Sequence, residues 1–487
     1  MLTSRVVRAG LVLPWLVLYG YLLWRTVQRA PGKRLASRVE SLLHVREPAL
    51  FLDSARAVVF ASWLFCIPDP SSLKETLARD LPIASPIGIF GFLPMSSVPL
   101  WTVDVATWSY RVAIVLGILG FFVRSGALVA AVSHIFLWSL QFSFGYSVHN
   151  HVVPMILLAL ALSPVASPTI VQYFRARSAG TPLAEVGSYP AYVVESVRFA
   201  LVAVYVQAGL EKLVHSGLRY FNGVTLQTHF LWGLERITPA ANWPLWFLGA
   251  AAVVTVAWEC SFGFAHYHPR ARLYLTVSAL IFHEIVRRGM SIDPFGFLEA
   301  GVLFFIPPAE LPLLWKGKGA PRTTPDSPPP LRRPLLAGVL VLCLLQWAPF
   351  FVRRGVYPFL SFSLFSGSYS GGEIQPRMAK IHYRVSPTSP WVQVDETKTL
   401  AMHTIAFSEF LTSRYASFYF EHLSLPHYAQ RFAHEDHREE HCQWLLSQVR
   451  QHLTDQATSL SVTLDYYVVG NTEQHRVSLY ECNLPAP

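Results

Sequence analysis

One apolar stretch, residues 195–217, carries charge where a membrane helix can least accommodate it. Residues 199–213 are apolar enough to cross most of a bilayer, yet Lys212 lies near their end. An ionisable residue at membrane depth costs at least roughly 2.5–3.5 kcal/mol on insertion scales, so it is a functional hypothesis by default. Tyr205 lies two helical turns before Lys212, and Gly209 between them lets another helix approach closely. We interpret this face as the wall of a reaction pocket.

The composition is typical of an integral membrane protein. Of the 487 residues, 52% are hydrophobic and only 14% are charged, whereas about 25% are charged in soluble domains. The net charge of +9 does not indicate nucleic-acid binding, because the Lys and Arg residues cluster in short loops between apolar segments. We therefore expect the lipid bilayer as a partner, and no nucleic acid.

The apolar segments predict about nine or ten transmembrane helices, although several are shorter than the roughly 20 residues of an ideal span. The first, residues 10–24, is followed by a basic run but by no small-residue cleavage site, which favours an anchor helix over a signal sequence. The other segments lie near residues 50–67, 105–122, 127–142, 152–164, 196–214, 244–264, 272–286, 295–308 and 334–352.

Basic residues concentrate in alternate loops, and the positive-inside rule makes those loops cytoplasmic. This orientation places the C-terminal region outside the cytoplasm, with the protein in the cell inner membrane; Arg5 and Arg8 argue mildly for the reverse. The cytoplasmic loops would hold Arg124, Arg175, Arg177, Arg270, Arg272, Lys316, Lys318, Arg322, Arg332 and Arg333.

We expect a polytopic α-helical membrane protein with a small C-terminal α+β soluble domain. In that domain "KIHYRVS", "SLSVTLDYYVVG" and "HRVSLYECNL" alternate like strands, with the turn "GNTEQ" between the last two, while about 402–421 and 428–453 look helical. Residues 319–333 are Pro-rich, which predicts an extended and mobile linker. The predicted regions are an N-terminal anchor and basic loop (1–42), a membrane domain (43–318), a linker with the last helix (319–354) and the soluble domain (355–487).

Polar residues from separate apolar segments are expected to share one layer. Asn150 and His151 begin one segment, Lys212 ends a second and His283 ends a third, and the predicted topology turns all three ends to the non-cytoplasmic side. Burial disfavours the ammonium form of lysine, so a histidine with a desolvated lysine is a workable acid–base pair. Such a pocket suits a lipid-soluble acid such as a quinol.

Structural roles remain open for each of these residues. Lys212 could extend to the membrane interface, Asn150 and His151 could start a helix, and His283 could bond a neighbouring helix.

Glu259 also lies within an apolar segment, where a carboxylate needs a partner. Arg56 or Arg111 could supply one. An internal ion pair between helices and a role in quinol binding are both open for Glu259.

The C-terminal domain contains a further histidine cluster, but no metal site is predicted. His434, His437 and His441 share one helical face, whereas the adjacent Cys442 points away from it. Zinc takes about four ligands in a tetrahedral array, so a solvated helix is favoured. A disulfide between Cys442 and Cys482, the two cysteines of this domain, remains open.

Several motifs carry a resemblance to a known family. In chain order they are "FLDSARAVVFASWLF", "WSYRVAIVLGILGFFVRSG", "NHVVPMILLALAL", "YVQAGLEKL" followed by "FNG", and "FHEIVRRGMSIDPFGFLEAGVLFFIPP". The region from about 43 to 308 resembles the HTTM module, the membrane domain of vitamin K-dependent γ-glutamyl carboxylase and its bacterial relatives. The chain after this region does not match the larger lumenal region of the carboxylase.

The resemblance implies an activity and roles for particular residues. In that family a membrane lysine deprotonates vitamin K hydroquinone, whose reaction with dioxygen makes a strong base that removes a γ-proton from glutamate, and carbon dioxide then adds. Lys212 matches that lysine, His151 the histidine that stabilises the quinol, Tyr205 a pocket tyrosine and His283 a further histidine. The implied cofactor is reduced vitamin K or another quinol, with dioxygen and carbon dioxide as co-substrates.

Three classes of function are therefore considered. The first is a carboxylase-like membrane enzyme that carboxylates glutamate in an exported peptide or acts on the quinol alone. The alternative is a non-catalytic HTTM scaffold for the maturation or export of a secreted peptide. A transporter is disfavoured, because the sequence has no inverted repeat and no obvious pair of broken helices.

Overall fold

The computed structural model describes much of the predicted membrane domain and part of the chain that follows it. The described residues are 45–78, 88–90, 92–93, 97–141, 151–163, 167–231, 243–266, 268–290, 300–323, 333–352, 374–394, 446, 449–450, 457–468 and 474–483. The predicted first helix, residues 10–24, lies outside them.

The chain is mostly helical and divides into two units. The larger unit comprises residues 1–67, 105–136 and 149–369. The smaller unit comprises residues 68–104, 137–148 and 370–487.

In the described part of the chain, four helices are long and apolar enough to cross a membrane. They are α5 (Leu100–Leu119), α6 (Val123–Gln141), α9 (Ala191–Ser216) and α11 (Leu245–Ser261), the last extended by the 3-10 turn η7 (Phe262–His266). On α5, Trp101 and Trp108 are 63% and 62% exposed, which suits a helix that faces lipid. The helices support a membrane-embedded protein, with fewer clear spans in the described residues than the sequence predicted.

Three of the other predicted spans are shorter or more polar and correspond to α3 (Ala49–Trp63), α7 (Val152–Ala161) and α12 (Pro269–Met290). The last corresponds to α15 (Arg333–Val352), which contains the apolar stretch Ala337–Trp347. Of the span predicted near 295–308, residues 295–299 lie outside the described part of the chain, residues 302–304 form the 3-10 turn η9 (Val302–Phe304), and the short helix α14 (Leu311–Trp315) follows.

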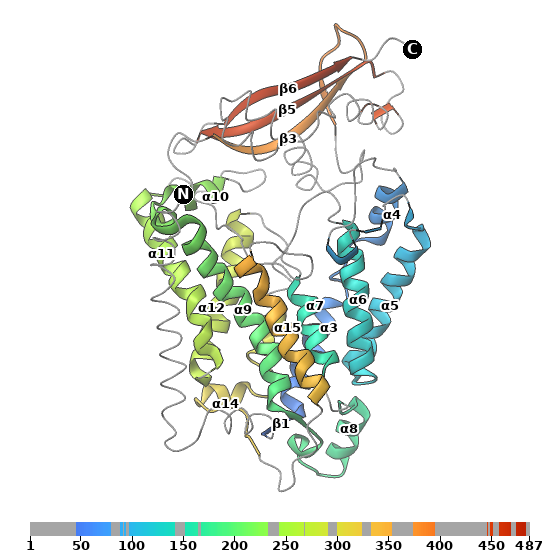
Figure 1. The fold of residues 1–487 in the computed structure, drawn as a ribbon, viewed down its shortest axis with the longest axis vertical. Helices are drawn as coiled ribbons and strands as arrows, with labels where there is room; N and C mark the ends of the chain where they lie inside the picture. The colour runs from blue at the N-terminus through green and yellow to red at the C-terminus, as the bar shows by residue number, and fades with distance from the viewer. Residues whose placement is uncertain are drawn as a thin grey trace. The chain divides into compact units, whose positions relative to one another are not determined.

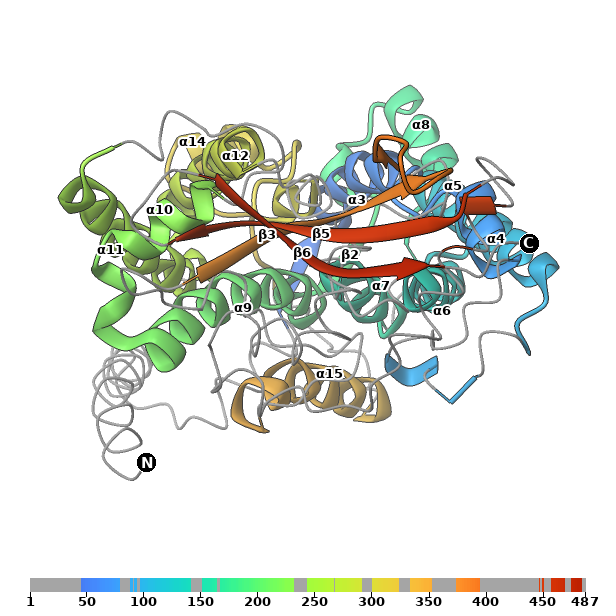
Figure 2. The same cartoon turned by 90° about the horizontal axis from the view of Figure 1, so that it is seen from above.

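Helix α9 is the centre of the larger unit. It packs against α7, α11 and α15, as the view from above shows (Figure 2). It begins directly after Pro190, whose fixed φ suits a helix start, and it ends at Gly217, whose φ of 57° disfavours other residues. A Cβ at Gly209 would lie 2.7 Å from Sγ of Cys260, so the predicted close approach of another helix is confirmed.

Two glutamines fasten α15 to α9. Gln207 donates from Nε2 to the carbonyl of Gln346 at 2.9 Å, and Gln346 donates from Nε2 to the carbonyl of Ala200 at 2.8 Å. Each bond therefore pairs a buried side-chain N–H with a backbone carbonyl of the opposite helix.

Short elements surround one end of α9 (Figure 1). Strand β1 (Arg46–Pro48) pairs antiparallel with β2 (Ser188–Pro190), which runs directly into α9. Helix α8 (Ile170–Ser178) and the 3-10 turn η4 (Leu183–Glu185) precede β2. Two further short elements, η5 (Gly217–Phe221) and α10 (Val224–Leu231), follow the other end of α9 in the chain. The short elements α4 (Pro70–Ala78) and η1 (Gly88–Phe90) come between α3 and α5 in the chain.

The beginning of the Pro-rich linker is anchored rather than mobile. Arg46 and Thr323 exchange two backbone hydrogen bonds of 2.9 and 3.1 Å, which attach the chain to the end of β1. The prediction of a mobile linker is therefore wrong for residues 319–323, while residues 324–332 lie outside the described part of the chain.

The smaller unit contains a four-stranded antiparallel sheet in the order β4-β3-β5-β6. The strands are β3 (Ile374–Arg384), β4 (Val392–Gln393), β5 (Ser459–Val468) and β6 (Gln474–Asn483). The three strands predicted after residue 380 are present, and the register of β3 shifts beside Pro376, which lacks an N–H for the ladder.

The described residues bear on few of the other predictions for this unit. The region of the predicted helices contributes only Leu446, Val449 and Arg450. His434, His437, His441 and Cys442 lie outside the described residues, so the disulfide stays a prediction.

Candidate functional site

The candidate site forms where α9 meets α11, η7 and α12. Helices α9 and α11 run side by side because Gly209 admits Cys260 and the backbone of α11. The side chains at positions 205 and 212 of α9 both contact α11 or η7, and they flank this crossing on either side. The sequence-predicted face of α9 therefore lies against a neighbouring helix.

Lys212 and Glu259 form a buried ion pair across this crossing. The ammonium of Lys212 donates to both carboxylate oxygens of Glu259, at 2.7 and 2.9 Å, and to the carbonyl of Ala208 at 3.3 Å. The two side chains are only 3% and 6% exposed. The proposed interfacial position of Lys212 is thus contradicted, because its amine is held inside the helix bundle.

The partner of Glu259 differs from the sequence-based expectation. Arg56, one of the two predicted partners, donates instead to Asp53, at 2.6 Å. Asp53 also accepts hydrogen bonds from Tyr173 and Tyr189. The other predicted partner, Arg111, lies with its guanidinium over the ring of Trp108, at 5.7 Å. Sequence spacing did not reveal the true partner, because the pairing is set by how α9 crosses α11.

A buried lysine–carboxylate pair has a chemical capacity that a single buried charge lacks. Removing either partner leaves an uncompensated charge, at a cost of about 3–5 kcal/mol. A proton can also pass along the short hydrogen bond between Lys212 and Glu259, which leaves a neutral amine and a neutral acid. Internal transfer therefore leaves no isolated charge, whereas a proton accepted by Glu259 from a bound acid leaves the ammonium of Lys212 to compensate the anion that forms.

An aromatic cluster lies two helical turns from the pair. Tyr205 stacks on Phe262 with ring centroids 3.8 Å apart, and it is parallel to His283 at 5.7 Å. The hydroxyl of Tyr205 and Nε2 of His283 are 3.2 Å apart. Trp258 meets the ring of Tyr205 edge-on at 5.6 Å. We call Tyr205, Trp258, Phe262 and His283 the aromatic cluster.

The aromatic cluster is held from two helices. Trp258 lies on α11, directly before Glu259, and donates from Nε1 to the hydroxyl of Ser278 on α12 at 2.7 Å. This bond fixes the ring of Trp258 between the two helices. The cluster combines flat apolar faces with one hydroxyl and one imidazole, which is the chemistry that recognises an aromatic alcohol.

His151 stands apart from these two pairs. His151 is buried directly before the first residue of α7, and it belongs to neither the Lys212–Glu259 pair nor the Tyr205–His283 pair. Helix α7 packs on α9. Asn150 lies outside the described residues, so its role stays a prediction.

Tyr220 is a site residue that the sequence reasoning missed. It is buried on η5, just after α9. Burial, and then the charge of Glu259, raise the pKa of Tyr220 well above its ordinary value, so the phenol stays protonated beside the ion pair. The available signal was its position immediately before the "FNG" motif.

Among the described residues, no three His, Cys, Asp or Glu side chains lie close enough together to hold a metal ion.

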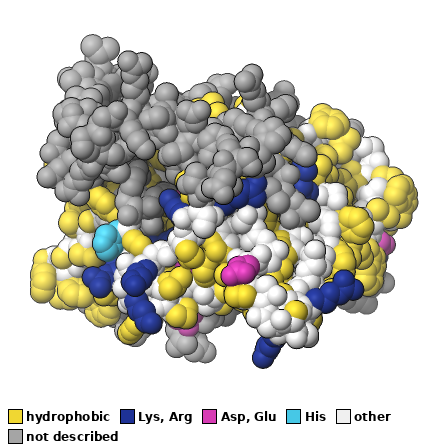
Figure 3. Space-filling view, turned by 90° about the horizontal axis from the view of Figure 1, so that it is seen from below, with side chains coloured by type: hydrophobic (Ala, Val, Ile, Leu, Met, Phe, Trp, Pro, Cys, Tyr) yellow, Lys and Arg dark blue, Asp and Glu magenta, His cyan; other side chains and the backbone are white. Residues whose placement is uncertain are grey.

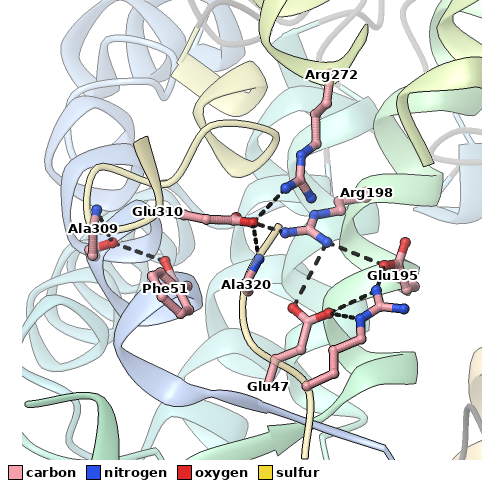
Figure 4. A network of polar contacts seen from close by, with 10 residues as sticks. Glu47, Phe51, Glu195, Arg198, Arg272, Ala309, Glu310 and Ala320 are labelled. Carbon is pink, nitrogen blue, oxygen red and sulfur yellow. Dashed lines mark hydrogen bonds and ion pairs between the residues drawn. The ribbon is translucent and has the colours of Figure 1, made fainter. Parts of the chain in front are cut away.

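A second buried set of charges lies at the other end of α9 (Figure 4). Arg198 contacts Glu310 at 3.2 Å, Glu195 at 3.2 Å and Glu47 at 3.9 Å. Glu310 is fully buried and also accepts hydrogen bonds from Arg272 and from the backbone N–H of Ala320. The members of this charged network are Glu47, Glu195, Arg198, Arg272, Glu310 and Arg322.

The charged network joins five parts of the larger unit. Arg322, from the anchored start of the linker, contacts both Glu47 of β1 and Glu195 of α9 at 2.8 Å. Three arginines and three glutamates compensate one another, although burial still raises the pKa of Glu47. The network is a structural clamp that fixes β1, α12 and the chain around Glu310 to α9.

Comparisons of the chain with protein-family models, with curated proteins and with solved structures gave no match.

Proposed function

We propose that the chain is a polytopic membrane enzyme of the vitamin K-dependent carboxylase type that acts on a quinol. The observation that carries the proposal is the buried Lys212–Glu259 pair, placed seven residues along α9 from the Tyr205–His283 pair. We place the enzyme in the cell inner membrane, with its C-terminal domain on the non-cytoplasmic side. The resemblance to the HTTM module supports the same proposal.

In this proposal the aromatic cluster binds the quinol ring and the ion pair receives its proton. The hydroxyl of Tyr205 and the imidazole of His283 offer a donor and an acceptor to a quinol hydroxyl. Because Phe262 already covers Tyr205 at 3.8 Å, the quinol ring takes the place of one of these aromatic contacts when it binds.

We assign the base to the pair rather than to Lys212 alone. In the ion pair the lysine is protonated, so the carboxylate of Glu259 accepts the proton and the ammonium of Lys212 stabilises the quinol anion. His151, which the resemblance matches to a quinol-stabilising histidine, keeps that role in the proposal.

A bound quinol, oxidised by dioxygen, would supply the strong base that removes a γ-proton from glutamate, to which carbon dioxide adds. Reduced vitamin K or another quinol fits the donor set, since the cluster presents aromatic faces beside a proton-accepting pair. The substrate in this version is glutamate in an exported peptide. A simpler version oxidises the quinol alone.

The test is quinol epoxidation by membranes containing the full chain, with and without a glutamate-containing peptide. We expect Glu259→Gln and Lys212→Ala to lower turnover by at least about 100-fold, the usual contribution of a general base. Epoxide without carboxylated peptide would select the version that acts on quinol alone. An active Lys212→Ala protein would remove the pair from the mechanism.

Loss of folding must be separated from loss of chemistry. The double variant Lys212→Glu with Glu259→Lys restores an ion pair across the same helices but exchanges the positions of base and cation. We expect this variant to recover stability, measured by thermal unfolding in detergent, while turnover stays low.

The second candidate is a non-catalytic HTTM scaffold for the maturation or export of a secreted peptide. The observation that favours it is that the ammonium of Lys212 donates to both carboxylate oxygens of Glu259. This is the geometry expected of an ion pair whose role is only to hold α9 and α11 together. Under this candidate, wild-type membranes form no epoxide although the quinol binds, and the exchanged double variant supports export as well as the wild type.

A further inference from the structure

Two short surface helices at one end of the larger unit expose apolar and basic side chains together. They are α8 and α14, which lie near β1 at that end (Figure 1). Helix α8 leads through η4 into β2, and the chain after α14 returns to Arg46 of β1 through Thr323. Both helices therefore flank the β1–β2 ribbon.

Helix α8 buries none of its residues. Ile170, Val171 and Phe174 are exposed, Phe174 by 62%. The helix is nevertheless well defined at its start, because Thr169 and Gln172 form a capping box. A helix with an apolar face and no protein to cover it needs another apolar environment.

Helix α14 has the same character. Leu311 is 41% exposed and Trp315 is 79% exposed, so a large aromatic ring stands clear of the protein. Lys316 and Lys318 follow directly, and Arg270 packs against Gly317 between them. Tryptophan beside basic residues is typical of the boundary between lipid tails and headgroups.

The basic residues on and beside these helices have no carboxylate partner in the described part of the chain. Arg175, Arg177, Arg270, Lys316 and Lys318 are all exposed, and within the described ranges none of them has a carboxylate partner. Glu185 is the exposed acidic residue of η4 nearby in the chain. The view of this end shows Lys and Arg side chains beside hydrophobic ones (Figure 3).

The arginines of the charged network provide an internal contrast. Arg198, Arg272 and Arg322 lie at the same end of the unit, and each contacts a glutamate within 4 Å. The protein therefore pairs the arginines that hold its fold together and leaves the five exposed basic residues for an external anion.

We propose that α8 and α14 lie in the headgroup layer of the membrane and bind anionic phospholipids. In this arrangement Phe174 and Trp315 reach the acyl chains, and Arg175, Arg177, Arg270, Lys316 and Lys318 contact the lipid phosphates. These residues belong to loops that the positive-inside rule assigns to the cytoplasm. The inference requires a membrane protein but does not depend on quinol chemistry.

The test is lipid retention by the full chain in nanodiscs that contain phosphatidylcholine and phosphatidylglycerol. After mild delipidation in detergent, the ratio of the two lipids that remain bound is measured by mass spectrometry. We expect the wild type to enrich phosphatidylglycerol. Neutralising Arg175 and Arg177 to Gln should lower this enrichment by roughly fivefold for each residue, the equivalent of about 1 kcal/mol per charge.

A matched control removes two positive charges elsewhere. The variant Lys74→Gln with Arg219→Gln has the same net charge but leaves α8 and α14 intact, so its enrichment should equal that of the wild type. Equal losses in the two double variants would overturn the proposal, because general electrostatics would then explain the retention.

The apolar contacts have a separate test. Phe174→Asp and Trp315→Asp should each lower phosphatidylglycerol retention while leaving the unfolding temperature unchanged, since both side chains are exposed. Retention that is unaffected by both changes would overturn the placement of these helices in the headgroup layer. Quinol turnover is not a readout here, so failure of this proposal is distinguishable from failure of the proposed function.

Discussion

Helix α9 carries a buried basic residue near each of its ends, and the two residues differ in the number and type of their partners. Arg198 and Lys212 are fourteen positions apart, about 21 Å along the helix. Arg198 contacts three glutamates, one of which is also bound by Arg272 and a backbone N–H. Lys212 has one carboxylate and one carbonyl, with the aromatic cluster two turns away.

The difference fits our proposal that Arg198 has a structural role and Lys212 a chemical one. Arginine stays protonated in proteins and its planar guanidinium matches several carboxylates at once, so the charged network fixes geometry. Lysine can pass its proton to a single carboxylate partner, as Lys212 could to Glu259. Burial alone therefore does not distinguish the two proposed roles, whereas the number and type of partners does.

The largest loss of stability is expected when the charged network around Arg198 is broken. Arg198→Ala leaves the fully buried Glu310 with one guanidinium and Glu47 with one, so we expect a loss of about 3–5 kcal/mol in the free energy of unfolding. The measurement is denaturant unfolding in detergent. Arg322→Ala is the control, because its side chain is 43% exposed and should cost about 1 kcal/mol or less. Similar losses in both variants would contradict the clamp.

A smaller effect is expected at the crossing that creates the ion pair. Gly209→Ala places a methyl group 2.7 Å from Sγ of Cys260, which forces α9 and α11 apart and should cost about 1–3 kcal/mol. Thermal unfolding would report the loss, and quinol turnover should fall with it. At Gly126 the nearest atom to an added Cβ is 3.4 Å away, so Gly126→Ala should be nearly neutral.

The smallest loss of stability is expected in the aromatic cluster, where the variant tests the proposed quinol site. Tyr205→Phe keeps the stack on Phe262 but removes the hydroxyl that meets His283, so we expect only about 1 kcal/mol of destabilisation. If the aromatic cluster binds quinol, KM for the quinol should rise in this variant. An unchanged KM would mean that the quinol ring binds elsewhere. Tyr220→Phe is the matched comparison, because it removes the hydroxyl of the buried tyrosine beside Glu259.

Sequence reasoning selected the residues of the site better than it selected their partners. Lys212 and Glu259 stood out because charge is rare in apolar segments, and Tyr205 followed from helical spacing. Their pairing depends on the crossing of α9 and α11 at Gly209, which no local pattern encodes. Arg56, offered with Arg111 as a partner for Glu259, pairs instead with Asp53 one turn away on its own helix, a local spacing that the sequence already contained.

The fold shows the same division between local and long-range information. Alternation predicted three strands of the sheet, and apolar length predicted the major helices, because both signals are local. The charged network was missed because Glu47, Arg198 and Glu310 come from distant parts of the chain and meet only after folding. The anchored start of the linker was missed for the same reason, since composition cannot reveal the bond between Arg46 and Thr323.

The paired amides of Gln207 and Gln346 have a consequence for how the last helix is retained. Because each reaches the other's helix backbone, α15 has a single register and rotation against α9. On the other side of the linker, Thr323 is fastened independently to β1. The covalent tether between residues 323 and 333 is thus largely redundant for docking α15, and a polypeptide severed there would still hold its two fragments together.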